Sequence, residues 1–360
     1  MVWRELCNFV AYRDVLWAGC GRPRRCRAVA IDGQSVQKVL TDNELTIADT
    51  TAMLLTAADI KQRALAMGFD VCGIATAAPV DERARRQYRQ WLERGRQGCM
   101  AWAERYQAVR DDPRALLDGA QSLVMVGMNY LPQRLQPADA PQFAYYAYGR
   151  DYHDVLKQRL WQLAAEIQEA TGCVSRACVD SAPLRERYWA QQAGLGFIGR
   201  NNQLIVPGRG SYFVLGALLT TLALEADAPC TLSCGDCGAC LEACPTGALD
   251  GDGAVDARRC LSCLTIELRG PLPEQAQSAL GHRVYGCDSC QRCCPHNSLA
   301  QATQHPEFEA SDELMSLTLD DIVAMDRTAF NRLFRHSAVK RAKLEGLKRN
   351  AHALRHPDEQ

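Results

Sequence analysis

The chain of 360 residues contains no long apolar segment and no excess of either charge. No stretch approaches the roughly 18 consecutive apolar residues that a membrane-spanning helix needs. Charged side chains interrupt the first 26 residues too often for a secretory apolar region, so the sequence predicts a cytoplasmic protein without a membrane segment. A net charge of −1 excludes a protein that coats nucleic acid over its whole surface, but it allows a local basic patch.

Residues 1–52 differ from the rest of the chain because they show no sustained helical or strand period. They form an N-terminal extension, or they result from a translation start that was assigned too early. Thr56 and Asp59, just after Met53, predict the N-terminus of a helix that ends near Gly68. Helical patterns at 81–95 and 154–170 then alternate with strand-like runs at 70–75, 122–130, 174–180 and 211–222. This mixture predicts an α/β or α+β domain over residues 53–225.

Cysteine is the residue type in clear excess, with 18 in the chain and eleven of them between Cys230 and Cys294. In a chain without an export signal, clustered C-x-x-C spacings more often bind metal or carry redox chemistry than form disulfides. Residues 226–300 also have little apolar periodicity, as expected where bound metal organises the chain, and the predicted domain extends over residues 226–305.

The spacing of these cysteines predicts two [4Fe–4S] clusters. The first run, C-x2-C-x2-C-x3-C-P, begins at Cys234 and has the bacterial ferredoxin pattern, in which the fourth cysteine ligates the other cluster. A second run begins at Cys287 and lacks one position, which Cys260 can supply. The predicted ligand sets are Cys234, Cys237, Cys240 and Cys294 for one cluster, and Cys244, Cys260, Cys287 and Cys290 for the other. Zinc sites are the alternative, and Cys230, Cys263 and Cys293 remain unassigned.

Several segments around these cysteines resemble one family. They are GRDYHDVLK (149–157), VDSAPLRERYWAQQAGLGFIGRNNQLI (179–205), CGDCGACLEACPTGAL (234–249), RCLSCLTIELRGPLP (259–273), YGCDSCQRCCPHN (285–297) and SAVKRAKLEGLKRNA (337–351). In this order they closely resemble the epoxyqueuosine reductases, from about Met53 to Arg355. The resemblance implies reduction of the epoxide of epoxyqueuosine in tRNA to queuosine, with two electrons, two protons and loss of the oxygen as water. It also implies cobalamin, which collects electrons from the two clusters.

The resemblance further implies an architecture and a set of partners. The expected fold is a cobalamin-binding α/β domain, a ferredoxin-like domain with two clusters, and a short, truncated HEAT-like helical tail over residues 306–360. The expected partners are tRNA and an electron donor of the ferredoxin or flavodoxin type, and the expected protein is a monomer.

By the same resemblance, Asp180 is the proton donor. That role requires a carboxyl that stays protonated near neutral pH, and hence a pKa raised by an apolar surrounding. Alternatively, Asp180 caps the turn at 181–183 or pairs with Arg185 or Arg187. The corrin contacts implied are Arg110, Ala144, Asp288 and Ser289, with Tyr152 and His153 as supporting groups. Asp288 and Ser289 lie inside a C-x2-C loop, so a corrin that rests there is close to the cluster.

The C-terminal part is basic, with nine Lys or Arg residues between Arg327 and Arg355 against one acidic residue, Glu345. Such an asymmetry suits phosphate contacts, and the resemblance makes the phosphates those of tRNA. The candidate RNA contacts are Lys340, Arg341, Lys343, Lys348 and Arg349. A solvated helix face is the simpler alternative.

Two other functions account for part of the pattern. A respiratory reductive dehalogenase shares cobalamin and two clusters, but it typically carries a twin-arginine export signal, and none is visible here. A ferredoxin-type electron carrier fused to an α/β domain explains the cysteines. It leaves Asp180, the GRDYH motif and the basic tail without a function.

Overall fold

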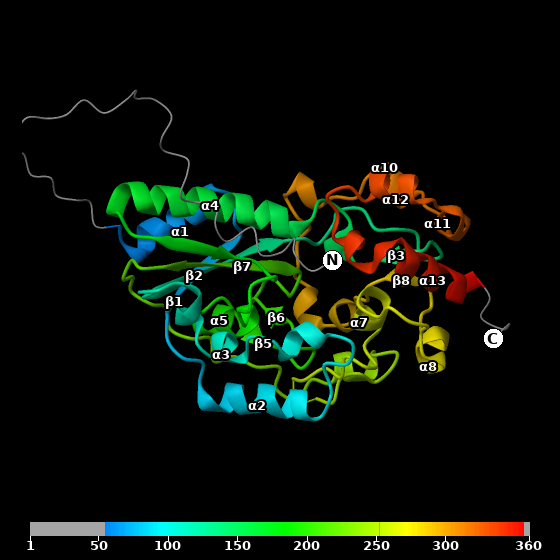
Figure 1. The fold of residues 1–360 in the computed structure, drawn as a ribbon, viewed down its shortest axis with the longest axis horizontal. Helices are drawn as coiled ribbons and strands as arrows, with labels where there is room; N and C mark the ends of the chain where they lie inside the picture. Colours follow the sequence, from blue (N-terminus) through cyan, green and yellow to red (C-terminus); the bar gives the residue numbers. More distant parts are fainter. Residues whose placement is uncertain (1–54, 252, 356–360) are drawn as a thin grey trace, which may run out of the picture. The chain divides into compact units, whose positions relative to one another are not determined.

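The computed structural model of the protein describes residues 55–251 and 253–355. The predicted N-terminal extension, residues 1–52, lies outside the described residues. A four-stranded antiparallel sheet forms the centre of the described part, with strand order β1–β2–β7–β4 (Figure 1). Its strands are β1 (Val71–Thr76), β2 (Ser122–Asn129), β4 (Ser175–Cys178) and β7 (Phe213–Thr220). All four predicted strands are confirmed, and the antiparallel order makes the sheet α+β in character.

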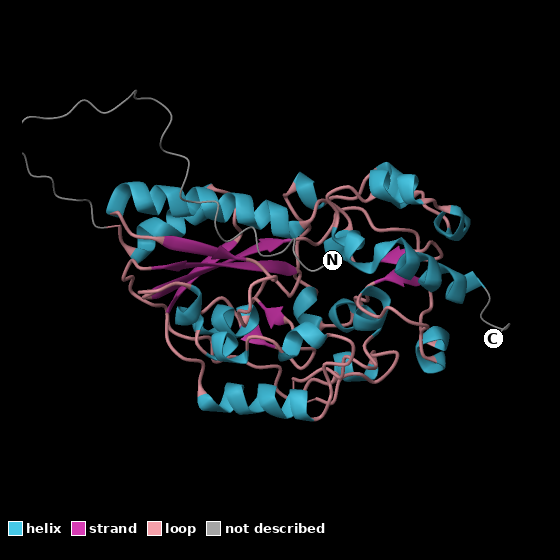
Figure 2. Cartoon of the chain, in the orientation of Figure 1, coloured by secondary structure: helices cyan, strands magenta, loops and turns pink. Residues whose placement is uncertain are grey.

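Both faces of the sheet are apolar because helices cover each of them. Along β2, Val124, Val126 and Met128 face one core, whereas Leu123 and Met125 face the other. This alternation is the period of two that a pleated strand imposes. Helices α1 (Ala57–Ala66) and α4 (Tyr152–Thr171) cover the first face, and α5 (Glu186–Gln192) covers the second (Figures 1 and 2).

The helices on the first face begin and pack as their sequence dictates. Thr56 and Asp59 form the predicted capping box of α1, with the Asp59 N–H donating to Thr56 Oγ1 at 3.2 Å. Helix α4 lies so close to β7 that a Cβ on Gly216 would stand 3.0 Å from the Leu160 side chain. Gly216 therefore allows the helix to seat on the strand, and the packed Leu160 is fully buried.

The remaining elements are short, and loops connect most of them (Figure 2). Helix α2 (Glu82–Glu93) starts at the N-cap Asp81, as the pattern at 81–95 predicts. The other strands are β3 (Gln142–Phe143), β5 (Phe197–Ile198), β6 (Leu204–Ile205) and β8 (Arg283–Tyr285). The other α-helices before residue 310 are α3 (Gln107–Asp111), α6 (Ala239–Glu242), α7 (Leu261–Ile266), α8 (Glu274–Ser278) and α9 (Ser289–Arg292). Helices α6, α7 and α9 carry or flank cysteines of the two predicted ligand sets.

The C-terminal part is helical, as predicted, and it packs against the segments before it. It comprises α10 (Asp312–Met315), α11 (Leu319–Ala324), α12 (Arg327–Leu333) and α13 (Lys343–Arg355). The buried amide of Asn350 on α13 donates to the carbonyls of Thr265 at 2.9 Å and Val284 at 2.7 Å. The apolar cluster around α4 extends to Leu344 and Leu347 on α13, so the tail shares a core with the sheet. In the described part of the chain, no helix is both long and apolar enough to cross a membrane.

Candidate active site

A large cavity of about 1630 Å³ gathers residues from all three parts of the sequence. One wall comes from the region around the sheet, one from the cysteine segment, and one from the residues before α13. The predicted site residues that line it are Arg110, Ala144, Tyr152, His153, Asp180, Cys244, Cys260, Cys287, Asp288, Ser289, Cys290, Lys340 and Arg341. The structure therefore brings every predicted corrin contact and the predicted catalytic residue to one place, together with one complete cysteine set.

Asp180 stands at the cavity in a strained backbone conformation. Its φ of +46° lies in the left-handed region, which a residue with a Cβ adopts only when its surroundings hold it there. The Asp180 N–H donates to Glu186 Oε1 at 2.6 Å, and Asp180 Oδ2 lies 3.1 Å from His153 Nε2. The side chain is 57% exposed, toward the cavity that it lines. His153 and the Tyr152 hydroxyl, which donates to it, thus hold the carboxyl, and Glu186 holds the backbone N–H.

The charges around Asp180 place protons on its neighbours. Burial alone would raise the pKa of Asp180, but the hydrogen bond and the charge of His153 outweigh it and hold that pKa below its ordinary value. Burial would lower the pKa of His153, yet Asp151 and Asp180 raise it to about 9. Burial raises the pKa of Glu186 to about 8, and Asp180 adds to the effect. The expectation of a raised pKa for Asp180 is therefore wrong in this structure. At neutral pH the protons lie on His153 and Glu186.

Arg185 and Arg187, the alternative partners of Asp180, form their hydrogen bonds with other groups. The Arg185 guanidinium binds Asp111 and donates to the carbonyl of Ala84 at 3.0 Å, and it lies over the ring of Tyr88. Arg187 donates to the carbonyl of Asn202 at 2.6 Å. Asp180 meets His153 instead, since the N-terminus of α4 carries that imidazole and Asp151 holds its Nδ1 at 2.6 Å.

Cysteines of each predicted set lie close enough together to affect one another's pKa. Burial raises the pKa of Cys260, and Cys287 and Cys244 raise it further. Likewise, burial and then Cys287 and Cys260 raise the pKa of Cys290. Burial raises the pKa of Cys294, and the charges of Cys234, Cys293 and Cys237 add to the effect. Burial also raises the pKa of Cys240, with Cys293, Cys234 and Cys294 adding to it. Cys294 therefore lies near cysteines of the first run and near the unassigned Cys293, and the crossed ligation stays a prediction.

The donor chemistry of the two predicted sets fits iron–sulfur clusters. Four cysteine thiolates hold one [4Fe–4S] cluster, and the two sets together offer eight. Among residues 55–251 and 253–355, no group of three or more His, Cys, Asp or Glu side chains is arranged to hold a single metal ion.

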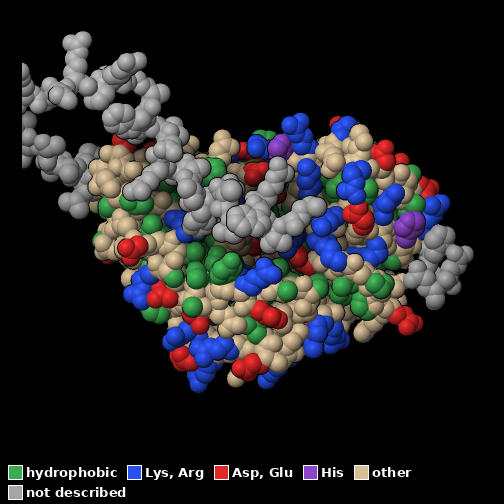
Figure 3. Space-filling view, viewed as in Figure 1, with side chains coloured by type: hydrophobic (Ala, Val, Ile, Leu, Met, Phe, Trp, Pro, Cys, Tyr) green, Lys and Arg blue, Asp and Glu red, His purple; other side chains and the backbone are tan. Residues whose placement is uncertain are grey.

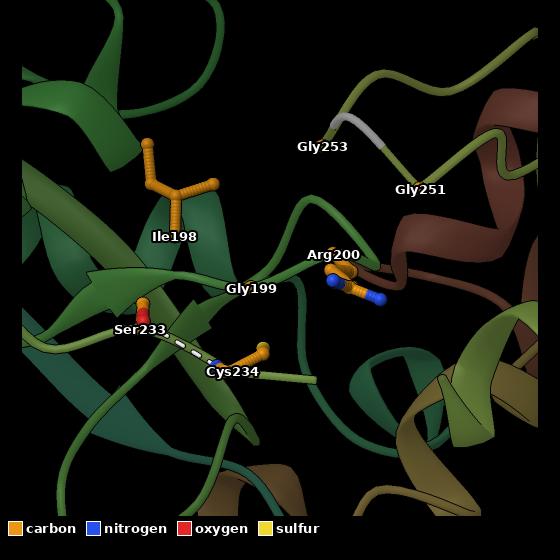
Figure 4. A pocket seen from close by; sticks show the side chains of 8 residues that line it. Ile198, Gly199, Arg200, Ser233, Cys234, Gly251 and Gly253 are labelled. Carbon is orange, nitrogen blue, oxygen red and sulfur yellow. Dashed lines mark hydrogen bonds between the residues drawn. The ribbon is translucent and has the colours of Figure 1, made fainter. Parts of the chain in front are cut away.

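The two cysteine sets face different surroundings. Cys244, Cys260, Cys287 and Cys290 line the large cavity. Cys234 instead lies beside a separate, small cavity of about 200 Å³, with Arg200 and Ile198 around it (Figure 4). One predicted cluster thus adjoins the candidate reaction site, and the other adjoins a separate opening.

Asp288 and Ser289 link the cavity to the second cysteine set. Asp288 Oδ2 accepts the N–H of Tyr145 at 2.8 Å, and Ser289 Oγ accepts from Arg283 at 2.7 Å. Ala144 comes so close that a Cβ on Gly286 would stand 2.5 Å from its Cβ, and Gly286 has a φ of +73°. Only glycine fits at this position, so the Ala144 loop rests directly on the loop that starts at Cys287.

Several residues of the cavity wall are absent from the sequence predictions. Tyr130, Tyr146, Glu186, Tyr285 and Gln291 all line the cavity. Gln291 lies between two predicted cluster ligands, and its amide donates to Tyr130 at 3.1 Å and to the Ser211 carbonyl at 3.0 Å. The sequence offered a signal for two of these residues, because Glu186 lies inside the VDSAPLRER motif and Gln291 lies inside the second cysteine run. The tyrosines lack such a signal, since only the fold brings them together.

The five candidate RNA contacts differ in their surroundings. Lys340 and Arg341 line the cavity, and Arg341 forms a two-pronged ion pair with Glu267 at 2.7 Å. Lys343 is exposed at the start of α13, and Lys348 is half-buried. Figure 3 shows that Lys and Arg side chains on the face drawn there are interspersed with acidic ones.

Arg349 has a structural role instead. Its guanidinium donates to the carbonyls of Leu264, Leu268 and Gly270 and to the side chain of Asn350. All five of its N–H groups are thereby used. Arg349 anchors α13 to the segment around α7, and it has no donor left for a phosphate.

Two family descriptions match the chain. "Epoxyqueuosine reductase QueG, DUF1730" matches residues 110–181, which include Asp180, and "4Fe-4S double cluster binding domain" matches residues 233–297, which include all eight predicted ligands. An epoxyqueuosine reductase from Leadbetterella byssophila is 42% identical over 293 residues, 81% of this chain and 96% of that protein. One from Synechococcus sp. (strain CC9605) is 42% identical over 305 residues, 83% of this chain and 94% of that protein.

The chain belongs to the epoxyqueuosine reductase family. Solved structures agree with this assignment. The crystal structure of an epoxyqueuosine reductase with an epoxyqueuosine-modified tRNA-Tyr stem loop has a TM-score of 0.75 and 31% identity, covering 82% of this chain and 80% of that one. A Bacillus subtilis epoxyqueuosine reductase, with its catalytic loop swung out of the active site, has a TM-score of 0.77 and 30% identity over 82% of this chain and 80% of that one. The predicted family, the oxidoreductase class and the double-cluster domain are confirmed.

Proposed function

We propose that this protein reduces epoxyqueuosine in tRNA to queuosine at the 1630 Å³ cavity, with Asp180 at the reacting epoxide. The observation that supports this best is the meeting of Asp180, His153 and a full cysteine set around one cavity. The reaction needs two electrons and two protons, and the epoxide oxygen leaves as water. With tRNA as its substrate the protein would act in the cytoplasm, and it would act as a monomer because one chain lines the whole cavity.

Cobalamin fits this cavity. The volume of the cavity exceeds the roughly 300–1,000 Å³ of a typical small-ligand site. A corrin and a substrate nucleoside together require such a larger space. When bound, cobalamin supplies a cobalt centre that can collect two electrons, whereas each [4Fe–4S] cluster passes one at a time. Arg110, Ala144, Asp288 and Ser289 would hold the corrin, with Tyr152 and His153 beside it. Asp288 and Ser289 lie between Cys287 and Cys290, so electrons would have a short path from that cluster.

The proton would come from the pair of Asp180 and His153. His153 holds a proton at neutral pH because Asp151 and Asp180 raise its pKa to about 9. Its Nε2 lies 3.1 Å from Asp180 Oδ2, which is within hydrogen-bond reach. As negative charge develops on the epoxide oxygen, Asp180 would take the proton of the His153 imidazolium and pass it on to that oxygen. This arrangement allows Asp180 to act as an acid although its own pKa is low.

The two cysteine sets would divide the transfer of electrons. The set with Cys244 and Cys290 lines the cavity, so its cluster would serve the cobalt centre. The set with Cys234 lies by the small separate cavity, where an electron donor of the ferredoxin or flavodoxin type would approach.

The tRNA would be contacted by four basic residues near and on α13, which are Lys340, Arg341, Lys343 and Lys348. The first two would contact it at the cavity itself. We also propose that the domains meet near residues 225 and 305 and that the helical tail is a truncated, HEAT-like segment.

An anaerobic turnover assay tests the proposal. Protein with both clusters verified by spectroscopy is incubated with cobalamin, a strong reductant and tRNA that carries epoxyqueuosine. Mass spectrometry of the digested nucleosides then reports conversion to queuosine through the loss of one oxygen atom. We expect conversion that depends on cobalamin. Unchanged epoxyqueuosine with both clusters and cobalamin bound would contradict the proposed substrate.

A further inference from the structure

Two cysteines outside the predicted ligand sets meet next to the large cavity. The Sγ atoms of Cys99 and Cys263 are 3.6 Å apart, although 164 residues separate them in the sequence. Cys99 is exposed, in the turn between α2 and the short helix that starts at Ala101. Cys263 is buried on α7, three residues after Cys260, and it lines the cavity. The proposed reaction uses neither thiol.

Hydrogen bonds join the segment that precedes Cys99 to the segment that precedes Cys263. The indole of Trp91 donates to the carbonyl of Val255 at 2.7 Å, and the N–H of Ala257 donates to the carbonyl of Arg96 at 2.8 Å. Gly98 has a φ of +55°, and a Cβ there would stand only 3.1 Å from the backbone nitrogen of Arg258. The turn that carries Cys99 therefore packs directly against the connecting segment that precedes α7.

The remaining step to a covalent bond is small. The sulfur atoms must approach from 3.6 Å to the ~2.05 Å of a disulfide, a movement of about 1.5 Å. Cys99 can provide this movement, since it lies in an exposed turn rather than in a helix. Cys263 has a fixed position on α7 and need not move.

The two thiols differ in their exposure to solvent, and this difference decides which of them reacts first. Cys99 is open to solvent, so a dissolved oxidant meets it first. Cys263 is buried beside it, so Cys99 is the first of the two thiols to react.

We propose that Cys99 and Cys263 are a reversible redox pair, which hydrogen peroxide oxidises to a disulfide. The Cys99 thiolate attacks the peroxide, the O–O bond breaks, and Cys99 becomes a sulfenic acid as the other oxygen takes up a proton and leaves as water. The Cys263 thiol then loses its proton as its sulfur attacks the Cys99 sulfur and forms the S–S bond, and the second oxygen leaves with that proton as water. Two thiols lose two electrons and two protons, and one peroxide becomes two waters. A dithiol reductant reverses the bond by thiol–disulfide exchange.

The disulfide would connect two walls of the cavity. Met100 and Trp102, which follow Cys99, line the same cavity as Cys263. A bond between Cys99 and Cys263 would therefore fix this turn to the segment that carries Cys260. It would also consume an oxidant at thiols that bind no iron.

Peptide mapping of the wild-type protein tests the pair without any variant. Anaerobic protein with intact clusters is treated with hydrogen peroxide at one equivalent per chain, its free thiols are alkylated, and the unreduced digest is analysed by mass spectrometry. We expect a peptide that joins Cys99 to Cys263 and that disappears after dithiothreitol. We also expect two fewer alkylated cysteines, while the visible absorbance of the clusters persists.

Variants separate this pair from the alternatives. Cys99→Ser and Cys263→Ser should each abolish the linked peptide, whereas Cys173→Ser, in the loop between α4 and β4, should retain it. Sulfinic or sulfonic Cys99 without a link would overturn the proposal. So would a link from Cys99 to another cysteine. Loss of a cluster in Cys263→Ser would also overturn it, because Cys263 would then be a cluster ligand. None of these readouts requires tRNA turnover, so the proposed function and this inference can fail separately.

Discussion

Glu186 holds Asp180 in position, and its removal should lower turnover without removing a cofactor. Its Oε1 accepts the Asp180 N–H at 2.6 Å, at a residue whose φ is +46°. A non-glycine residue in that region costs about 1–3 kcal/mol, so its contacts must hold it there. Glu186→Ala leaves the Asp180 N–H without this acceptor, a loss of about 1–3 kcal/mol. We predict that kcat falls roughly 5- to 150-fold, with unchanged clusters and cobalamin.

Glu186→Gln is the matched control, because it retains an oxygen acceptor but cannot ionise. Burial raises the pKa of Glu186 from 4.5 to about 8. A carboxyl whose pKa is raised by folding contributes fully to stability below pH 4.5 and loses that contribution as the pH rises through about 8. Above pH 8 the wild-type protein carries a second negative charge beside Asp180. We therefore predict that Glu186→Gln has nearly wild-type kcat at pH 7, loses less thermal stability than the wild type as the pH rises from 4.5 to about 8, and loses less activity than the wild type above pH 8.

The assay is the pH profile of kcat for the wild type, Glu186→Gln and Glu186→Ala, with iron content and cobalamin absorbance measured on each sample. Wild-type kcat in Glu186→Ala would refute the positioning role. An alkaline decline in Glu186→Gln that matches the wild type would refute the assignment of that titration to Glu186.

Four further predictions concern other parts of the molecule. Asp180→Asn should retain both clusters and cobalamin and lower kcat by about 10²–10⁴, the usual contribution of a general acid, and an active variant would remove that role. Cys294→Ser should damage the cluster held by Cys234, as iron analysis and electron paramagnetic resonance can report; damage to the other cluster alone would contradict the crossed ligation. Leu160→Ala should lower the free energy of unfolding by about 2–5 kcal/mol in denaturant titrations, because Leu160 is fully buried, and a loss near zero would contradict its place in the core. Lys343→Ala should weaken tRNA binding and reduce the slope of log affinity against log salt by about 1, whereas an unchanged slope would make Lys343 part of a solvated face.

The sequence predicts the parts of this protein that depend on local patterns. The capping box at Thr56 and the strands of the central sheet have strong local signals, and the structure contains them. The cysteine spacing also predicts that Cys294 joins Cys234, since the proline after each run sends the fourth cysteine elsewhere. These features need only neighbouring residues or a fixed spacing.

Long-range electrostatics lie beyond such patterns. The pKa of Asp180 depends on His153, 27 residues earlier, and on the loop that brings the two side chains together. A count of charges makes Arg349 a candidate for RNA binding, but three backbone carbonyls from the region of α7 use its donors. The contact of Cys99 with Cys263 likewise exists only in the folded chain. In each case, the deciding partner is far away in the sequence.

The most direct test of the central claim compares wild-type protein and Asp180→Asn in the anaerobic assay with tRNA that carries epoxyqueuosine. Both samples are matched for iron and bound cobalamin, and nucleoside mass spectrometry follows the loss of the epoxide oxygen over time. The account predicts complete conversion to queuosine by the wild type and little conversion by the variant. Equal conversion by both would show that the proton does not pass through Asp180. No conversion by the loaded wild type would contradict epoxyqueuosine as the substrate.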